Sequence, residues 1–164
     1  IENKILIFKQ KMFYYKFNLQ YEGFTWFGPK AVKKKNFLSP QWLRDIKNKK
    51  YPFWRIDTLK SKNKYQNIKF IDDGGWHFTC IKNPEEVQKK LMTFLHHQDY
   101  EESKMTLQDL KKRMQKKEIL YDHSLDKKDG NKWATNIKLK KINETYLPFH
   151  IRANIKKYSE WIES

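Results

Sequence analysis

Two aspartates and two glycines separate a pair of short apolar runs near the middle of the chain. The runs cover residues 68–71 and 78–81, and residues 72–78 read Asp-Asp-Gly-Gly-Trp-His-Phe. Branched and aromatic side chains in both runs predict two strands, and the glycines predict a bend between them. From these residues alone, the bend is either an ordinary hairpin turn or a loop that presents functional side chains.

The same stretch carries the chemical groups that a carbohydrate site needs. The carboxylate of Asp72 or Asp73 can take a proton from a hydroxyl group, and the Trp76 indole offers a flat apolar face to a sugar ring. The His77 imidazole can contact a phosphate or a metal ion. We therefore take Asp72, Asp73 and His77 as candidate catalytic residues, Gly75 and Trp76 as candidate substrate-binding residues, and His77 as the candidate metal ligand.

A second group of candidate side chains lies at residues 94–102, which read Phe-Leu-His-His-Gln-Asp-Tyr-Glu-Glu. His96 is the candidate substrate-binding residue in this group. The alternative is that His96 and His97 are cations favoured at the end of a helix, followed by ordinary loop charges. The spacing does not resemble a closed metal site.

Strand and helix signals alternate along the chain and predict a mixed α/β fold, with a mixed sheet flanked by helices in one domain over residues 1–164. The expected strands cover residues 54–57, 68–71 and 136–142, and residues 12–19 read as a strand or as the end of a buried helix. The expected helices begin near Ser39, Asn83, Thr106 and Pro148, and the second is expected to end near His96. Residues 121–132 read as a loop, and His123 and His150 as ordinary surface or helix-end residues.

The formal charge of +16 makes nucleic acid a partner to consider. However, 31 of the 35 basic residues are lysines spread along the chain. Dedicated readers of phosphates and bases depend on the bidentate guanidinium of arginine. We therefore expect no nucleic-acid partner, and the rival of a basic nucleic-acid-binding module predicts steeply salt-dependent binding to generic RNA or DNA.

Cys80 is the single cysteine, so neither an intrachain disulfide nor a cysteine metal site can form. No apolar run approaches the length of a membrane span. If the chain is complete at its N-terminus we expect a cytoplasmic protein, whereas a longer form with a membrane anchor is also compatible with the sequence.

Several segments, in this order, resemble the later half of glycosyltransferase family 17, the β-1,4-mannosyl-glycoprotein N-acetylglucosaminyltransferases. Residues 74–79, Gly-Gly-Trp-His-Phe-Thr, are similar to its Gly-Trp-His-Phe-Ser type motif and are the most distinctive match. The weaker matches are the aromatic run 12–18, the Trp-x-Gly-like segment at 26–30, the short helix from Ser39 to Arg44, the Phe-x-His-like ending at 94–96, and the C-terminal segment 147–158. On this basis Trp26 is a further candidate substrate-binding residue.

The resemblance implies an enzyme of GT-A-like fold that transfers N-acetylglucosamine or a related sugar, with inversion, from a nucleotide-sugar donor to a glycan acceptor. It also implies a divalent cation, Mn²⁺ or Mg²⁺, held mostly by an Asp-x-Asp segment that precedes the matching region in the family. This sequence does not contain that segment, so we expect an N-terminally truncated fragment. A non-catalytic carbohydrate-binding domain is the third alternative.

Overall fold

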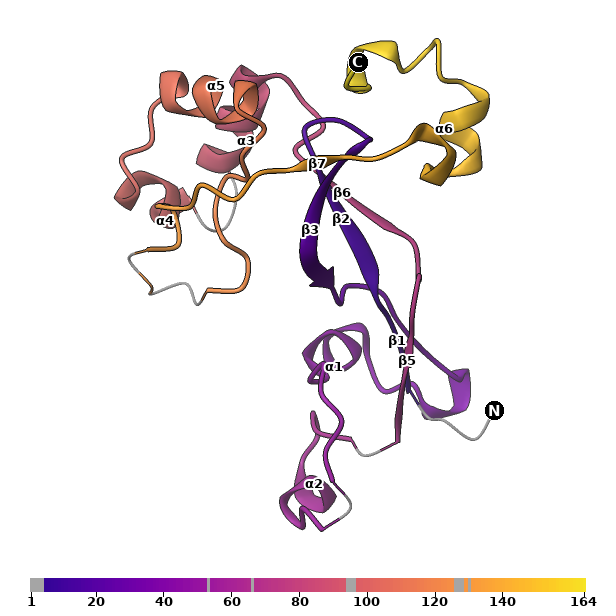
Figure 1. The fold of residues 1–164 in the computed structure, drawn as a ribbon. Helices are drawn as coiled ribbons and strands as arrows, with labels where there is room; N and C mark the ends of the chain where they lie inside the picture. The colour runs from indigo at the N-terminus through magenta and orange to yellow at the C-terminus, as the bar shows by residue number, and fades with distance from the viewer. Residues whose placement is uncertain (1–4, 53, 66, 94–96, 126–128, 130) are drawn as a thin grey trace. The chain divides into compact units, whose positions relative to one another are not determined.

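The computed structural model describes residues 5–52, 54–65, 67–93, 97–125, 129 and 131–164. It confirms the mixed α/β class, with two mixed sheets and several helices (Figure 1). The chain forms two compact units, each built from two stretches of sequence. The first unit comprises Ile1–Gln10 and Thr25–Gly75, and the second comprises Lys11–Phe24 and Trp76–Ser164. Each unit has its own buried core.

The first unit contains a three-stranded sheet with β1 (Ile5–Phe8) at its centre. This strand pairs antiparallel with β4 (Lys30–Val32) and parallel with β5 (Ile68–Ile71), which confirms the strand predicted over residues 68–71. Alternate residues of a strand face opposite sides, so one face of the sheet can supply a core. That core consists of Ile5, Ile7, Ile46 and Ile68.

Helix α1 (Pro40–Asp45) begins where the sequence predicts. The Ser39 hydroxyl accepts a hydrogen bond from the backbone N–H of Trp42 at 3.1 Å, and Pro40 stands at the first helical position, where an N–H would have no helical partner. A short 3₁₀ helix, η1 (Lys34–Asn36), precedes it.

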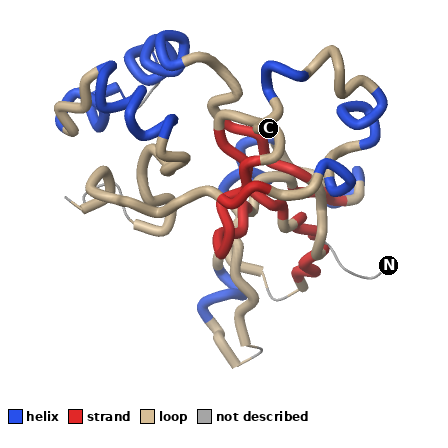
Figure 2. Tube along the Cα trace, turned by 45° about the horizontal axis from the view of Figure 1, so that its top comes forward, coloured by secondary structure: helices blue, strands red, loops and turns tan. Residues whose placement is uncertain are grey.

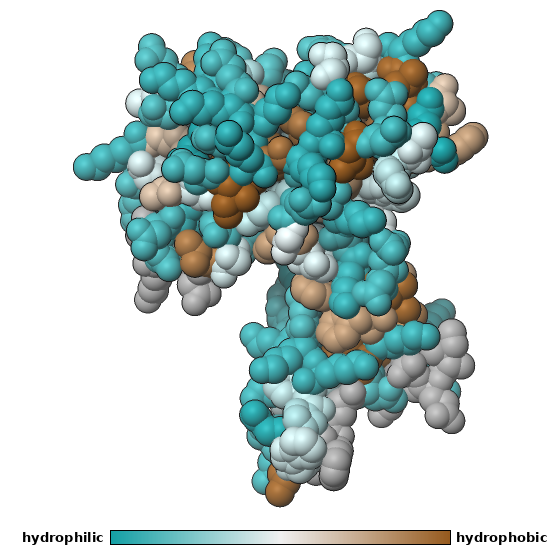
Figure 3. All heavy atoms as spheres, in the orientation of Figure 1, coloured by the Kyte–Doolittle hydropathy of each residue, from teal (hydrophilic) through white to brown (hydrophobic). Residues whose placement is uncertain are grey.

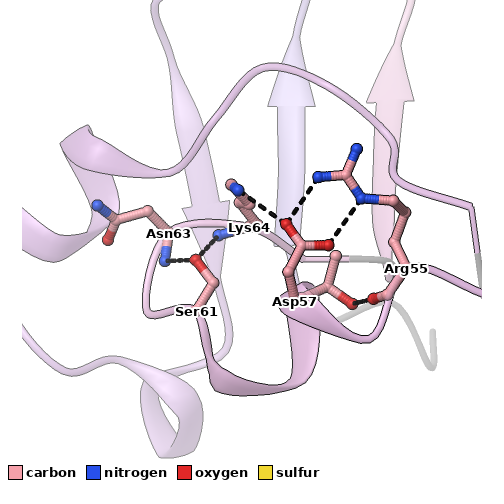
Figure 4. Close-up of polar contacts among 6 residues, drawn as sticks. Arg55, Asp57, Ser61, Asn63 and Lys64 are labelled. Carbon is pink, nitrogen blue, oxygen red and sulfur yellow. Dashed lines mark hydrogen bonds and ion pairs between the residues drawn. The ribbon is translucent and has the colours of Figure 1, made fainter.

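The strand predicted over residues 54–57 is wrong, because the chain turns there and enters α2 (Asp57–Lys60). Arg55 donates through Nε and Nη2 to the two carboxylate oxygens of Asp57, both at 2.7 Å, and Lys64 donates to the same carboxylate at 2.9 Å (Figure 4). These cations hold the pKa of the Asp57 carboxyl well below its usual value. The local contacts favour a turn, and the exposed Trp54 and Ile56 contribute no buried strand face.

The second unit contains a four-stranded sheet in the order β6–β2–β3–β7. Its strands are β6 (Trp76–Thr79), β2 (Gln10–Tyr14), β3 (Leu19–Trp26) and β7 (Lys140–Lys141). Strand β6 pairs parallel with β2, and β7 pairs antiparallel with β3. Within the predicted segment 12–19, residues 12–14 therefore belong to strand β2. Strands β5 and β6 lie in different sheets. The hairpin reading of residues 72–78 is wrong, because each of these two strands pairs with another partner.

Three helices of the second unit pack together, with α3 (Pro84–Thr93) in contact with both α4 (His97–Glu102) and α5 (Leu107–Gln115). Two of them start at predicted caps. Asn83 Oδ1 accepts from the Glu86 N–H at 2.9 Å, and the Thr106 side chain and Asp109 form a reciprocal capping box. The predicted end near His96 lies outside the described residues, and the charges that follow belong to α4 rather than to a loop.

The C-terminal helix predicted from Pro148 is interrupted. Helix α6 (Phe149–Ala153) ends at Asn154, and only a 3₁₀ segment, η3 (Ser159–Trp161), follows. Asn154 Nδ2 donates to the His150 carbonyl at 2.8 Å, so a side chain occupies a backbone acceptor at the end of the helix. The strand predicted over residues 136–142 is confirmed only for Lys140–Lys141, and loops make up most of the chain between α5 and β7 (Figure 2).

Hydrophilic side chains predominate on the face of the molecule that Figure 3 displays. This matches a sequence in which charged residues make up 33%. Among the helices of the described residues, none combines the length and the apolar character that crossing a membrane requires.

Candidate functional site

In the first unit, the segment that follows β5 is held by Lys9, the residue directly after β1. Lys9 Nζ donates to Asp72 Oδ1 at 2.7 Å and lies 5.6 Å from the centre of the Phe70 ring. The Gly74 N–H donates to the Lys9 carbonyl at 2.7 Å. Asp72 is thus engaged in an ion pair, although its side chain remains 76% exposed.

Backbone conformation explains the sequence Asp-Gly-Gly. Asp73 has a φ of 49° in the left-handed region, where aspartate and asparagine are several-fold enriched. Gly75 has a φ of 116°, a value that residues with a side chain rarely adopt. Gly74 is needed for a different reason, because a Cβ atom there would lie 2.7 Å from the Cβ of Phe8.

Gly74→Ala is therefore expected to lower the free energy of unfolding by about 1–3 kcal/mol, since Phe8 or the backbone beside it must move. Urea denaturation measures the effect. Gly23→Ala tests the other cause of such a loss, because Gly23 has a positive φ of 82° and no atom within 4 Å of the added methyl group. A wild-type stability of Gly74→Ala would contradict a steric role for Gly74.

In the second unit, strand β6 directs Trp76 and His77 to opposite faces of the sheet. Trp76 lies beside Lys11 in the parallel pairing with β2, and His77 lies beside Met12. Met12 belongs to the buried core of this unit, so His77 is on the core face. Strand β6 lies at the edge of its sheet.

Trp76 bonds to a segment that carries two exposed aromatic side chains. The Trp76 indole is 39% exposed, and its Nε1–H donates to the Tyr146 carbonyl at 2.9 Å. Tyr146 and Phe149, on either side of Leu147 and Pro148, are 68% and 77% exposed. We call Trp76, Tyr146 and Phe149 the aromatic patch.

On the opposite face, His77 is half-buried. Burial lowers the pKa of His77, and the positive charge of Lys90 on α3 lowers it further. The imidazole is therefore neutral at pH 7 and has a cation nearby. A neighbouring cation attracts an anion such as a phosphate and opposes a bound metal ion.

His123, which the sequence places among ordinary surface or helix-end residues, is instead part of an aromatic cluster on the core face. Its Nε2 hydrogen-bonds to the hydroxyl of the buried Tyr14, and its ring centre lies 4.4 Å from that of Tyr121 and 5.4 Å from that of Phe24. Burial lowers the pKa of His123 to about 4, and the charge of the nearby His77 acts in the same direction. The expectation for His123 is wrong because Tyr14 lies 109 residues away in the chain, and no local sequence pattern predicts such a pairing.

The depressed pKa of His123 makes stability depend on pH. Unfolded histidine has a pKa near 6.5, so between about pH 6.5 and pH 4 the unfolded state binds more protons than the folded state. The contribution of His123 to the free energy of unfolding should be fully present above pH 6.5. It should fall by roughly 2–3 kcal/mol as the pH drops to 4. Urea denaturation at pH 7.5 and pH 4.5 measures this loss.

His123→Phe is expected to reduce that pH dependence and to lower stability at pH 7.5 by about 1–3 kcal/mol, because the Tyr14 hydroxyl loses its partner. His150→Phe is the control, since His150 is exposed and its imidazole hydrogen-bonds to the hydroxyl of Tyr158. A wild-type pH dependence in His123→Phe would contradict the assignment.

The candidate site residues from the sequence are divided between the two units. Asp72, Asp73, Gly75 and Trp26 belong to the first unit, where Trp26 lines a pocket. Trp76 and His77 belong to the second unit. His96 lies outside the described residues.

A divalent cation finds no complete ligand set in the described part of the chain. No group of three or more His, Cys, Asp or Glu side chains there is arranged to hold a metal ion. No step of the chemistry is assigned to a metal here.

No protein-family model, curated protein or solved structure matches the chain. Function is therefore argued from the residues and from their arrangement within each unit.

Proposed function

We propose that the protein is a glycosyltransferase that transfers a sugar from a nucleotide-sugar donor to a glycan acceptor, with inversion at the transferred carbon. The observation that carries the proposal is that Trp76 of the Gly-Trp-His-Phe motif is exposed and bonds to the carbonyl of Tyr146, in a segment that carries the exposed side chains of Tyr146 and Phe149. Flat, partly exposed indole and phenol rings with polar edges suit the apolar faces of sugar rings. N-acetylglucosamine as the transferred sugar, and a GT-A-like fold, follow from the family resemblance.

The chemistry needs a base for the acceptor hydroxyl and a group that stabilises the departing diphosphate. Asp73 is assigned as the base from its place in the sequence, three residues before Trp76. Asp72 is the less suitable carboxylate because Lys9 already pairs with it. His77 is assigned to the diphosphate, since its imidazole and the ammonium of Lys90 both favour an anion.

Trp76→Ala is expected to raise the KM for the acceptor about 10-fold, which corresponds to about 1.4 kcal/mol of lost stacking and contact. Steady-state kinetics of the full-length protein with varied acceptor measure it. Trp76→Phe should restore most of the affinity, because it keeps an aromatic face and removes only the bond to the Tyr146 carbonyl.

Trp54→Ala is the matched control, since Trp54 is an exposed tryptophan outside the aromatic patch. If Trp54→Ala and Trp76→Ala changed the acceptor KM equally, the aromatic patch would not be the acceptor site.

A further inference from the structure

An open pocket of about 480 Å³ lies entirely within the first unit, apart from the aromatic patch. This volume is in the range of pockets that bind small ligands. Most of its wall is apolar and is formed by Trp26, Phe27, Phe37, Pro40 and Leu43. The polar lining is restricted to Lys30, Arg44 and Asn48. A mainly apolar wall with a few polar groups is typical of a site that orients a ring-bearing ligand.

Gly28 allows the Trp26 indole to form part of this wall. A Cβ atom at position 28 would lie 2.2 Å from Trp26 Nε1 and 2.8 Å from Cδ1, so only glycine leaves the indole where it is. The sequence around these residues therefore fixes the position of a flat, partly exposed ring.

Lys30 fixes the end of α1, which carries Arg44. Its ammonium donates to the carbonyl of Arg44 at 2.8 Å and to that of Ile46 at 2.5 Å, and burial lowers the pKa of Lys30. Within the described residues, the structure records no hydrogen bond or ion pair of the Arg44 guanidinium. A positioned guanidinium with five donors matches a carboxylate or a phosphate.

The charge around the pocket is strongly positive. Between Thr25 and Lys50 the single acid is Asp45, whereas the basic residues are Lys30, Lys33, Lys34, Lys35, Arg44, Lys47, Lys49 and Lys50. The exposed lysines 33–35 come just before Phe37, and Lys47 and Lys49 are adjacent to Asn48. Such a rim raises the local concentration of anions.

We infer that this pocket binds an acidic sugar, with the ring against Trp26 and its phosphate or carboxylate on Arg44. The need for an anion and a ring comes from the pocket itself, and the choice of a sugar rests on the proposed transferase function. The ligand would be either a sugar phosphate or a uronic acid.

Calorimetric titration of the full-length protein with glucose 6-phosphate, glucuronic acid, methyl glucoside and inorganic phosphate tests the inference. We expect one or both acidic sugars to bind at least 10-fold more tightly than methyl glucoside and inorganic phosphate. The comparison of the two acidic sugars identifies the anion. Arg44→Gln and Trp26→Ala should each weaken that binding at least 10-fold, and Arg152→Gln, which removes an exposed arginine of the second unit, should leave it unchanged.

Failure of both acidic sugars to bind, or equal effects of Arg44→Gln and Arg152→Gln, would overturn the inference. So would a generic RNA oligonucleotide that binds more tightly than either sugar with a steep salt dependence, since that points to a nucleic-acid surface. Asp73→Asn should bind the acidic sugar normally. If the wild type bound the acidic sugar but transferred no sugar, the proposed function would be rejected and the inferred binding pocket would stand.

Discussion

Asp73→Asn is expected to lower kcat for sugar transfer by the full-length protein about 10²–10⁴-fold, the usual contribution of a general base. The substitution removes the proton acceptor and keeps the size and shape of the side chain. Asparagine tolerates the left-handed conformation that Asp73 adopts at a φ of 49°, so the turn should be preserved. Initial rates at saturating donor and acceptor, together with a urea denaturation curve, separate loss of chemistry from loss of fold.

Asp72→Asn is the matched control for this variant. The side chain of Asp72 is paired with Lys9 and lies largely in solvent, so the substitution should change kcat by less than about 3-fold and stability by less than about 1 kcal/mol. A wild-type rate in Asp73→Asn, or a large loss confined to Asp72→Asn, would show that Asp73 is not the base.

His77→Ala is expected to lower kcat/KM for the donor about 10–100-fold. Hydrogen bonds to charged groups are worth about 1.5–3 kcal/mol, and the neutral imidazole can donate one to the departing diphosphate. His77→Gln should recover part of the activity because its amide can donate a similar bond. Kinetics with varied nucleotide sugar measure both variants.

Stability must be followed in the same experiment, because His77 lies half-buried on the core face of β6. His150→Ala is the control, since it removes an exposed histidine of the same unit. An unchanged donor kcat/KM in a folded His77→Ala protein would remove this residue from the proposed site.

The helix starts could be predicted from the sequence because their causes are local. Ser39, Asn83 and Thr106 each accept a hydrogen bond from a backbone N–H three residues further along the chain. The expected length of the last helix failed because the Asn154 side chain bonds to the backbone at its end. The expected strand at residues 54–57 failed because Arg55 and Asp57 bond to each other across a turn.

The sheet pairings depend on distant residues and could not be read from the sequence. Strand β6 pairs with β2, more than 60 residues earlier, which places Trp76 and His77 on opposite faces. The contact of His123 with Tyr14 joins residues 109 apart in the chain. The candidate residues 72–77 could be proposed from their chemistry. The ion pair of Asp72, the bond of Trp76 to the Tyr146 carbonyl and the cationic neighbour of His77 needed the structure.

The most direct test of the central claim is a transfer assay with the full-length protein, UDP-N-acetylglucosamine and a mannose-containing glycan acceptor, analysed by mass spectrometry. The proposal predicts an acceptor that gains one N-acetylhexosamine in the wild type and a rate at least 100-fold lower in Asp73→Asn. If no sugar were added from this or any other nucleotide sugar, or if Asp73→Asn transferred at the wild-type rate, the proposed mechanism would be contradicted.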